Sequence, residues 1–279
     1  MLNIFLAALS GMCAVGQSAF TKASSEKTNS PMRFNTFKVG IAFLLFLPIS
    51  FYNMNMHFHI PTLLFGACYG LSLFCSTLFG YLALKNGPMA LTSLIVSYSV
   101  IIPCFYGIVF LNESVDFFQI IGFLLLLVSM YLLKWQADKI KLNKSWFLYI
   151  IITFFCNGIC SVIQKLHQTI YPSSYCNEFM IYSMFITFAL FMVLSVLKKE
   201  NKNTNSAKYA IASGMLMGIG NYITLILSSN VNASILFPIT SIFSMLFNVI
   251  ISKLYFKDTF NILQLAGIGL GVISVLLIK

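Results

Sequence analysis

Two short acidic segments lie half a chain apart and carry the residues best suited to ion or proton chemistry. The first, LNESVDFFQIIG at residues 111–122, contains Glu113, and the second, FKDTFNILQLAG at residues 256–267, contains Asp258. In both segments a glutamine follows the acid by six residues and a glycine by nine. A hydroxyl residue directly after each acid can also cap the first N–H groups of a helix. We therefore interpret both segments as capped helix starts in preference to ion-coupling sites.

The composition excludes a soluble fold. The chain of 279 residues is 59% hydrophobic and 9% charged, with a mean hydropathy of +0.89, whereas soluble domains are about 25% charged. About 20 apolar residues cross a bilayer. The sequence thus predicts an all-α membrane protein with ten transmembrane helices, at residues 2–21, 34–52, 61–84, 89–111, 117–133, 145–164, 179–197, 208–228, 233–254 and 260–278.

The ten spans divide into two five-helix units, residues 1–134 and 145–279. The sixth span matches the first at an offset of 143, which pairs Lys22 with Lys165, and the acidic segments match at an offset of 145. The third and eighth spans share a G-x-x-x-G step, Gly66 with Gly70 and Gly214 with Gly218, at an offset of 148. An odd number of spans per unit inserts the second unit upside down. This is the inverted-repeat architecture of secondary transporters.

The basic residues support the inversion. Fifteen of the seventeen Lys and Arg residues fall on one predicted membrane face, which the positive-inside rule makes cytoplasmic, so both termini should face outward. These residues flank apolar spans, which indicates contact with membrane lipids and no nucleic-acid binding. The first apolar run lacks a preceding basic region, and we expect it to be a retained helix, not a signal peptide.

Polar side chains inside the apolar spans are the candidate substrate contacts, because such groups cost free energy in lipid unless they are paired or hydrated. For each, a contact between helices is the alternative. The lysines have two interpretations: snorkelling to the lipid headgroups, or attraction of an anionic group in the transport path. The predicted substrate-binding residues are Gln17, Lys22, Tyr81, Tyr98, Asn157, Gln164, Lys165, Asn221 and Tyr222.

Other chemistries lack the residues that they need. No Asp or Glu lies at the centre of a span, so a membrane-embedded carboxylate cannot drive proton exchange. His57 and His59 have no third ligand nearby, and the seven cysteines form no C-x-x-C pair, which predicts no metal site. No P-loop, G-x-S-x-G or H-E-x-x-H motif occurs. We predict no cofactor and no enzymatic activity.

The segment GPMALTSLIVSYS after Asn86, followed by an apolar helix and then LNES with Gln119 and Gly122, resembles the EamA-like repeat of the drug/metabolite transporter superfamily. The resemblance covers the whole chain as two repeats. It implies a ten-helix bundle around a central path that carries small metabolites across the plasma membrane, and Lys22 and Lys165 match its pattern. Two features depart from related proteins. Pro103 and Pro238 are not equivalent in the two halves, and the glutamate of small multidrug resistance proteins is replaced by Ala14 and Asn157.

We therefore expect a plasma-membrane secondary transporter, a monomer or homodimer, that exports or exchanges a small polar metabolite such as an amino acid by alternating access. The alternative is a polytopic membrane enzyme or a lipid-handling protein. Its chemistry would have to come from His57 with His59, or from Glu113 with Asp116, which do not form a known catalytic set.

Overall fold

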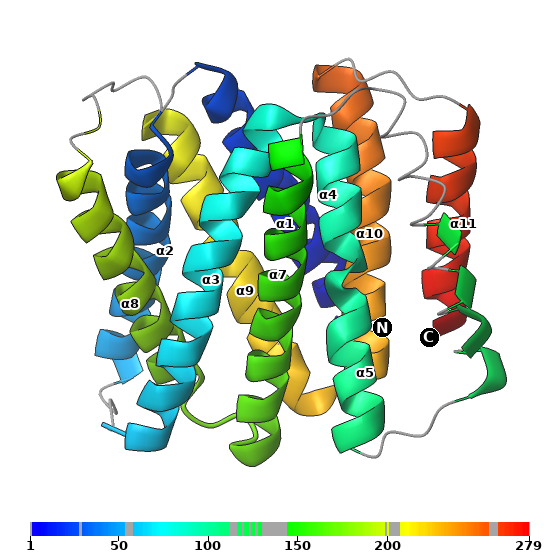
Figure 1. Cartoon of the computed structure of the whole chain (residues 1–279). Coiled ribbons are helices and arrows are strands. Elements are labelled where there is room, and N and C mark those ends of the chain that lie inside the picture. Colours follow the sequence, from blue (N-terminus) through cyan, green and yellow to red (C-terminus); the bar gives the residue numbers. More distant parts are fainter. Residues whose placement is uncertain are drawn as a thin grey trace.

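In the computed structural model, every element of regular secondary structure in the described residues is a helix (Figure 1). This confirms the all-α prediction. It describes residues 2–27, 30–53, 58–111, 116–118, 120–122, 124–125, 128–129, 144–198, 200, 207–256 and 262–278. The helices are α1 (Leu2–Lys27), α2 (Pro31–Asn53), α3 (Ile60–Asn86), α4 (Met89–Ser97), the 3₁₀ turn η1 (Tyr98–Val100), α5 (Ile101–Phe110), α7 (Lys144–Ile170), α8 (Cys176–Leu197), α9 (Ala207–Asn230), α10 (Ala233–Tyr255) and α11 (Ile262–Ile278).

Seven stretches of the described chain are helical, long and apolar enough to cross a membrane. They are α1, α3, the run from α4 through α5, α7, α8, α9 and α10. The other three predicted spans coincide with α2, with helical residues between Phe117 and Ser129, and with α11. The ten-span count itself stays a prediction. Glu113 and Asp258, with the linker between the two units, lie outside the described residues.

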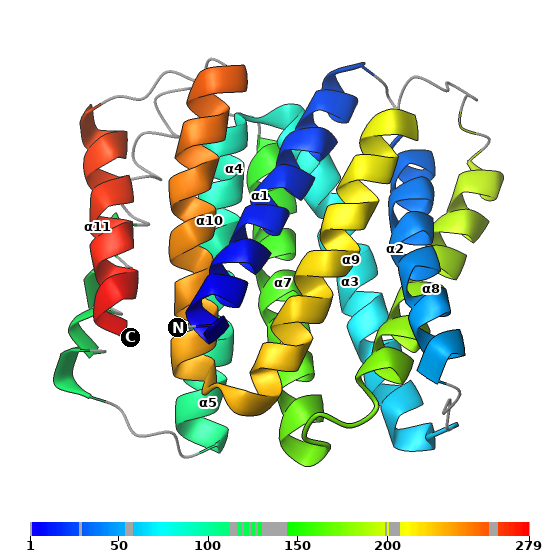
Figure 2. The same cartoon turned by 180° about the vertical axis from the view of Figure 1, so that it is seen from behind.

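The two halves run through the bundle in opposite directions. In Figures 1 and 2, α1 ends at the upper side, where α7 begins, and the chain ends of α1 and α11 both lie toward the lower side. We call the side of Lys27 and Lys144 the upper face, and the side of Ile60 and Ile170 the lower face. The second repeat is therefore inverted with respect to the first.

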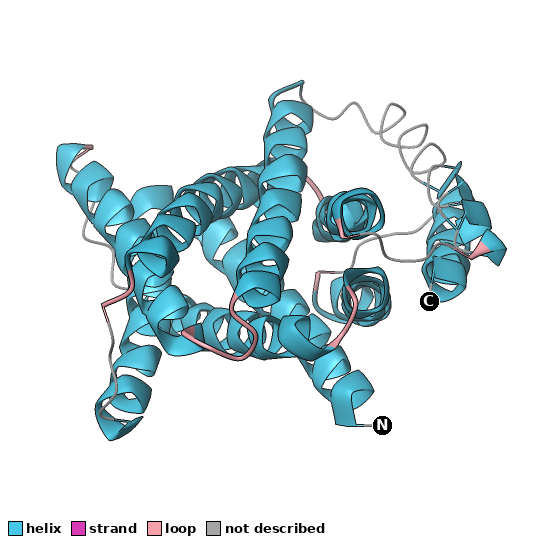
Figure 3. Cartoon of the chain, turned by 90° about the horizontal axis from the view of Figure 1, so that it is seen from below, coloured by secondary structure: helices cyan, strands magenta, loops and turns pink. Residues whose placement is uncertain are grey.

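The helix contacts repeat with the sequence. Helix α1 packs on α9 as its counterpart α7 packs on α3, and α2 packs on α9 as α8 packs on α3. Helices α2 and α8, which are equivalent in the two repeats, contact each other across the pseudo-symmetry axis. Figure 3 shows α11, which carries the C-terminus, at the edge of the bundle and away from these central contacts.

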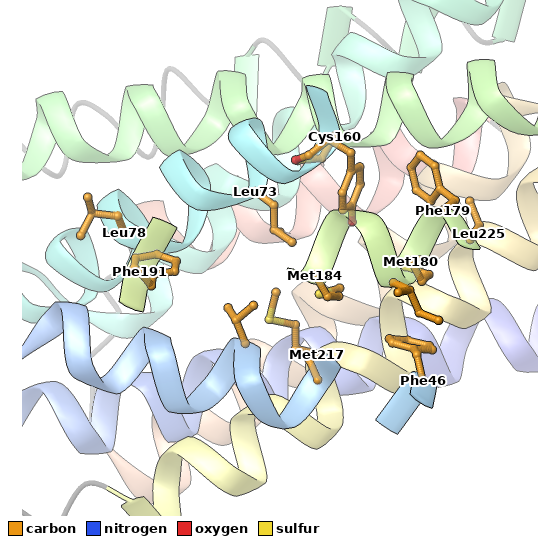
Figure 4. Close-up of a cluster of buried hydrophobic side chains, with 14 of the residues drawn as sticks. Phe46, Leu73, Leu78, Cys160, Phe179, Met180, Met184, Phe191, Met217 and Leu225 are labelled. Carbon is orange, nitrogen blue, oxygen red and sulfur yellow. The ribbon is translucent and has the colours of Figure 1, made fainter. Parts of the chain in front are cut away.

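Two apolar clusters flank the centre of the bundle. One joins α2, α3, α7, α8 and α9 through side chains such as Phe46, Met180 and Met217 (Figure 4). The other joins α4, η1, α5, α7 and α10 through residues that include Tyr98 and Trp146. Between the clusters the helices present polar side chains, and these line the cavity that is described next.

The fourth span is broken in only one of the two halves. Pro103 cannot donate a backbone hydrogen bond to the preceding turn, and the 3₁₀ turn Tyr98–Val100 lies directly upstream of it. In the second half, Pro238 lies inside the continuous helix α10. The predicted inequivalence of the two prolines thus appears as a different backbone in the two spans.

Candidate functional site: a polar cavity between the two halves

A cavity of about 250 Å³ occupies the centre of the bundle. Its lining comes from α1, α2, α3, α4, η1, α7, α9 and α10, so both repeats contribute. Hydroxyl and amide groups dominate its polar surface, and Lys38 is the charged residue among the lining residues. A concave site with converging polar groups is the usual form of a small-molecule site.

The cavity lining follows the internal repeat. Five lining residues of α1 match five lining residues of α7 at the offset of 143 that the sequence shows. The pairs are Ser10 with Thr153, Ala14 with Asn157, Gln17 with Cys160, Ser18 with Ser161, and Thr21 with Gln164. The two helices therefore present the same face to the cavity from opposite directions, which places the cavity on the pseudo-symmetry axis.

Some lining groups are held by hydrogen bonds between helices. Asn157 Nδ2 donates to Ser99 Oγ at 2.7 Å, beside the 3₁₀ break, and Gln164 Nε2 donates to the Tyr69 hydroxyl at 3.2 Å. The hydroxyls of Ser10 and Thr224 lie 2.6 Å apart. These bonds fix the cavity wall, because a polar group in an apolar bundle loses free energy when it is left unpaired.

Other lining groups have no such partner among the described residues. The Ser93 hydroxyl is buried without a hydrogen-bond partner, and the Gln17 and Asn221 side-chain amides make no hydrogen bond to another described residue. An amide both donates and accepts. These groups can therefore bind water or a polar ligand in the cavity.

Five of the nine predicted substrate-binding residues meet at this cavity: Gln17, Tyr81, Asn157, Gln164 and Asn221. Two others lie elsewhere in the bundle. The Tyr98 hydroxyl is buried 2.5 Å from Ser129 Oγ, and the Tyr222 hydroxyl donates to Asn177 Oδ1 at 2.7 Å beside a smaller hollow. For all nine residues, a role in substrate binding stays a prediction.

The two predicted lysines bind helix ends. Lys22 Nζ donates to the carbonyls of Leu84 and Gly87, at 2.8 and 3.1 Å, at the C-terminus of α3. Lys165 Nζ donates to the carbonyls of Ser228 and Val231, at 3.2 and 2.8 Å, at the C-terminus of α9. Neither lysine lines the cavity. A cation there satisfies free carbonyls and the negative end of the helix dipole.

The structure adds Lys38, which falls within the predicted span 34–52 but was counted only among the basic residues of one membrane face. Helix α2 begins at Pro31, so Lys38 lies two turns inside it and is 2% exposed. The signal in the sequence was the proline: Pro is favoured at the first helical position, and a helix that starts there carries Lys38 into the bundle.

The remaining predicted groups form no metal or catalytic cluster in the part of the chain that the structure describes. His59 caps α3 by accepting from the Thr62 N–H and stacks on Tyr175 at a ring distance of 4.3 Å. His57, Glu113 and Asp258 lie outside the described residues, and so does the Gln264 side chain. In the described end of the second acidic segment, residues 262–267, the Gly267 carbonyl accepts a hydrogen bond from Ser129 Oγ at 2.6 Å.

Known structures share the architecture. A solved protein titled "Crystal structure of protein" superposes with a TM-score of 0.70 at 16% identity, and the match covers 97% of this chain and 95% of that chain. In all, 28 solved chains match. At this identity the likeness shows the fold. A search of curated protein sequences finds no match.

The family comparison covers both repeats. Residues 1–135 and 144–279 each match the EamA-like transporter family, and the two matches reproduce the two repeats that the sequence predicts. The matched segments together span nearly the whole chain. This polar cavity between inverted repeats is therefore the central cavity of a membrane transporter, and the chain belongs to the EamA-like transporter family.

Proposed function

We propose that the protein is a secondary transporter of a small polar metabolite, which it moves through the central cavity by alternating access between its inverted halves. The observation that carries the proposal is the matched polar lining of α1 and α7. A site on a pseudo-symmetry axis can be opened to either face by equivalent rocking motions of the two halves. The cavity, at about 250 Å³, lies below the roughly 300–1,000 Å³ of drug-sized sites, which favours a small metabolite.

We propose ten membrane spans and a plasma-membrane location, with the upper face in the cytoplasm. Nine of the ten described Lys and Arg residues lie in the upper halves of their helices or at the upper face, and Lys165 is the exception. This bias supports cytoplasmic exposure of the upper face by the positive-inside rule. Both termini would then face outward. We also propose export or exchange as the direction of transport, which the topology does not decide.

The alternative, a membrane enzyme or lipid-handling protein, has less support. The described lining residues of the cavity include no Asp, Glu or His, and the described part of the chain holds no cluster of His, Cys, Asp and Glu that could bind a metal. Acid–base chemistry needs such groups within hydrogen-bond reach of a substrate.

Reconstitution into liposomes tests the proposal. Vesicles loaded with one unlabelled amino acid, nucleoside or cationic dye should take up the labelled form of the same compound by counterflow, for at least one compound of the panel. Empty vesicles and vesicles with heat-inactivated protein are the controls. Hydrolysis or transfer of a lipid or metabolite without counterflow of any compound would favour the enzyme instead.

A further inference from the structure

Lys38 lies inside the bundle, where the described residues supply no ion-pair partner. Its side chain is 2% exposed and lines the central cavity. The structure gives its ammonium group no hydrogen-bond or ion-pair partner among the described residues. Removal of an ammonium group from water without a partner is costly in free energy. The protonated form of Lys38 therefore needs a partner in the cavity, either water or a bound anion.

Two other lysines, the half-buried Lys22 and the buried Lys165, show how an ammonium group is satisfied in this bundle. Lys22 and Lys165 each donate to two backbone carbonyls, and Lys22 also pairs with Glu26 at 3.3 Å. Among the described residues, Lys38 has no such carbonyl contact and the cavity lining holds no acid. When it is protonated, Lys38 therefore gives the cavity a positive charge that none of the described lining residues compensates.

The position of Lys38 is fixed by its backbone. A Cβ atom on Gly214 of α9 would collide with the Lys38 carbonyl oxygen, so the two helices touch at this residue. The buried and unpartnered Ser93 hydroxyl lines the same cavity from α4. An ammonium group on this anchored backbone and a free hydroxyl are suited to an anionic oxygen, because charge-assisted hydrogen bonds are the strong ones.

We propose that Lys38 is the anion-recognition residue of the cavity and that the transported substrate is a small metabolite with a carboxylate. This proposal rests on the transporter function proposed above. A monoanionic carboxylate matches the single lysine among the described lining residues, whereas a dianionic phosphate would keep one charge uncompensated at low dielectric. Lys38 is thus a specificity-determining residue: it selects for the anionic group, and the neutral lining accommodates the rest.

The test compares carboxylates with their amides on purified full-length protein. Thermal unfolding and counterflow are measured with a panel of L-amino acids and small carboxylic acids, and with the carboxamide of each. For the best ligand, the wild type should bind the carboxylate about tenfold or more tightly than the amide. Lys38→Met should bind both forms with the affinity that the wild type has for the amide, and Lys38→Arg should keep the preference.

Two controls separate binding from folding. Without ligand, Lys38→Met should unfold at the same or a higher temperature than the wild type, because methionine removes a buried charge at similar length. Lys22→Met should lower the unfolding temperature and keep the preference for carboxylates. Lys38→Met would then be a folded protein with altered selectivity.

The outcomes distinguish this inference from the transporter function. Counterflow of neutral or cationic compounds, with no preference for carboxylates, would overturn the role of Lys38 and leave the transporter function standing. If Lys38→Met kept the wild-type preference for carboxylates over amides, the role of Lys38 would be overturned and the transporter function would stand. If the wild type transports and binds no compound of the panel, both the proposed function and the inference fail.

Discussion

The bundle contains the same helix contact twice, once near each face, and the two copies differ in charge. Near the upper face, Gly214 of α9 meets Lys38 of α2, and near the lower face, Gly66 and Gly70 of α3 meet Ser183 of α8. Lys38 and Ser183 are equivalent at the offset of 145. Ser183 Oγ is satisfied within its own helix by the Phe179 carbonyl, whereas Lys38 lines the cavity.

This difference shows which properties are shared by the repeats. Small residues let paired helices approach closely, and this packing is kept in both halves because both need the same backbone contact. The lysine is not repeated, because Ser183 occupies the equivalent position in the second half. The cavity is therefore electrostatically asymmetric although the helices around it are arranged symmetrically. We infer that architecture comes from the repeated features and substrate selectivity from the features that differ.

Filling the glycine contacts should have the largest effect. In Gly214→Ala, the added Cβ would meet the Lys38 carbonyl oxygen, a backbone atom that cannot rotate away, and in Gly66→Ala it would lie 2.9 Å from Tyr182 Cβ. Overpacking of this kind costs about 1–3 kcal/mol, and we expect Gly214→Ala at the upper end. Thermal unfolding in detergent measures both changes.

Gly269→Ala is the matched control, because a Cβ at that position of α11 meets nothing within 4 Å. It should leave stability unchanged or raise it by up to about 1 kcal/mol through helix propensity. If Gly214→Ala were as stable as Gly269→Ala, the close contact between α2 and α9 would be wrong.

Removing a capping lysine should have an intermediate effect that is similar in the two halves. Lys22→Met and Lys165→Met each leave two helix-end carbonyls without their donor. We expect a loss of about 1 kcal/mol each, the scale of hydrogen bonds between membrane helices and of charges at helix ends. Unfolding measurements should show the loss, with partial recovery in the Lys→Arg variants.

Transport assays on the same variants decide between the two interpretations of these lysines. A capping role predicts that the affinity for substrate survives in the folded fraction. Unchanged stability with lost affinity would instead favour lysines that contact the substrate.

The smallest effects should come from adjacent residues on α9. Asn221 lines the cavity, and Asn221→Ala should weaken substrate binding about fivefold, the value of one hydrogen bond of about 1 kcal/mol. Tyr222 instead donates to Asn177 Oδ1 beside a separate hollow, so Tyr222→Phe should leave the affinity unchanged. Counterflow at varied substrate concentration measures both. If Tyr222→Phe weakened substrate binding more than Asn221→Ala, the substrate site would instead lie near α8.

Much of the frame was predictable from the sequence. Apolar length defined the helices, and the offset of 143 between α1 and α7 paired the residues that face the cavity, such as Ser18 with Ser161. Gln17 and Asn157 were predicted as substrate contacts because amides are costly in lipid, and both line the cavity.

Other features depend on contacts between distant segments, which a sequence pattern does not specify. The carbonyls that accept from Lys22 belong to Leu84 and Gly87, more than sixty residues away. The position of Lys38 depends on where α2 begins, and a hydropathy pattern locates the apolar centre of a helix better than its polar end. The 3₁₀ turn Tyr98–Val100 precedes Pro103, whereas the proline alone indicates only that a kink is near.

The central claim, that the cavity between the halves is the transport path, is tested most directly by blocking it. Ser161→Trp would fill the cavity from α7, and Ile159→Trp adds the same side chain to an exposed position of the same helix outside the cavity. Both variants are compared with the wild type in counterflow, after size-exclusion chromatography confirms folding. We predict that Ser161→Trp abolishes counterflow and Ile159→Trp retains it; undiminished counterflow by Ser161→Trp would contradict the account.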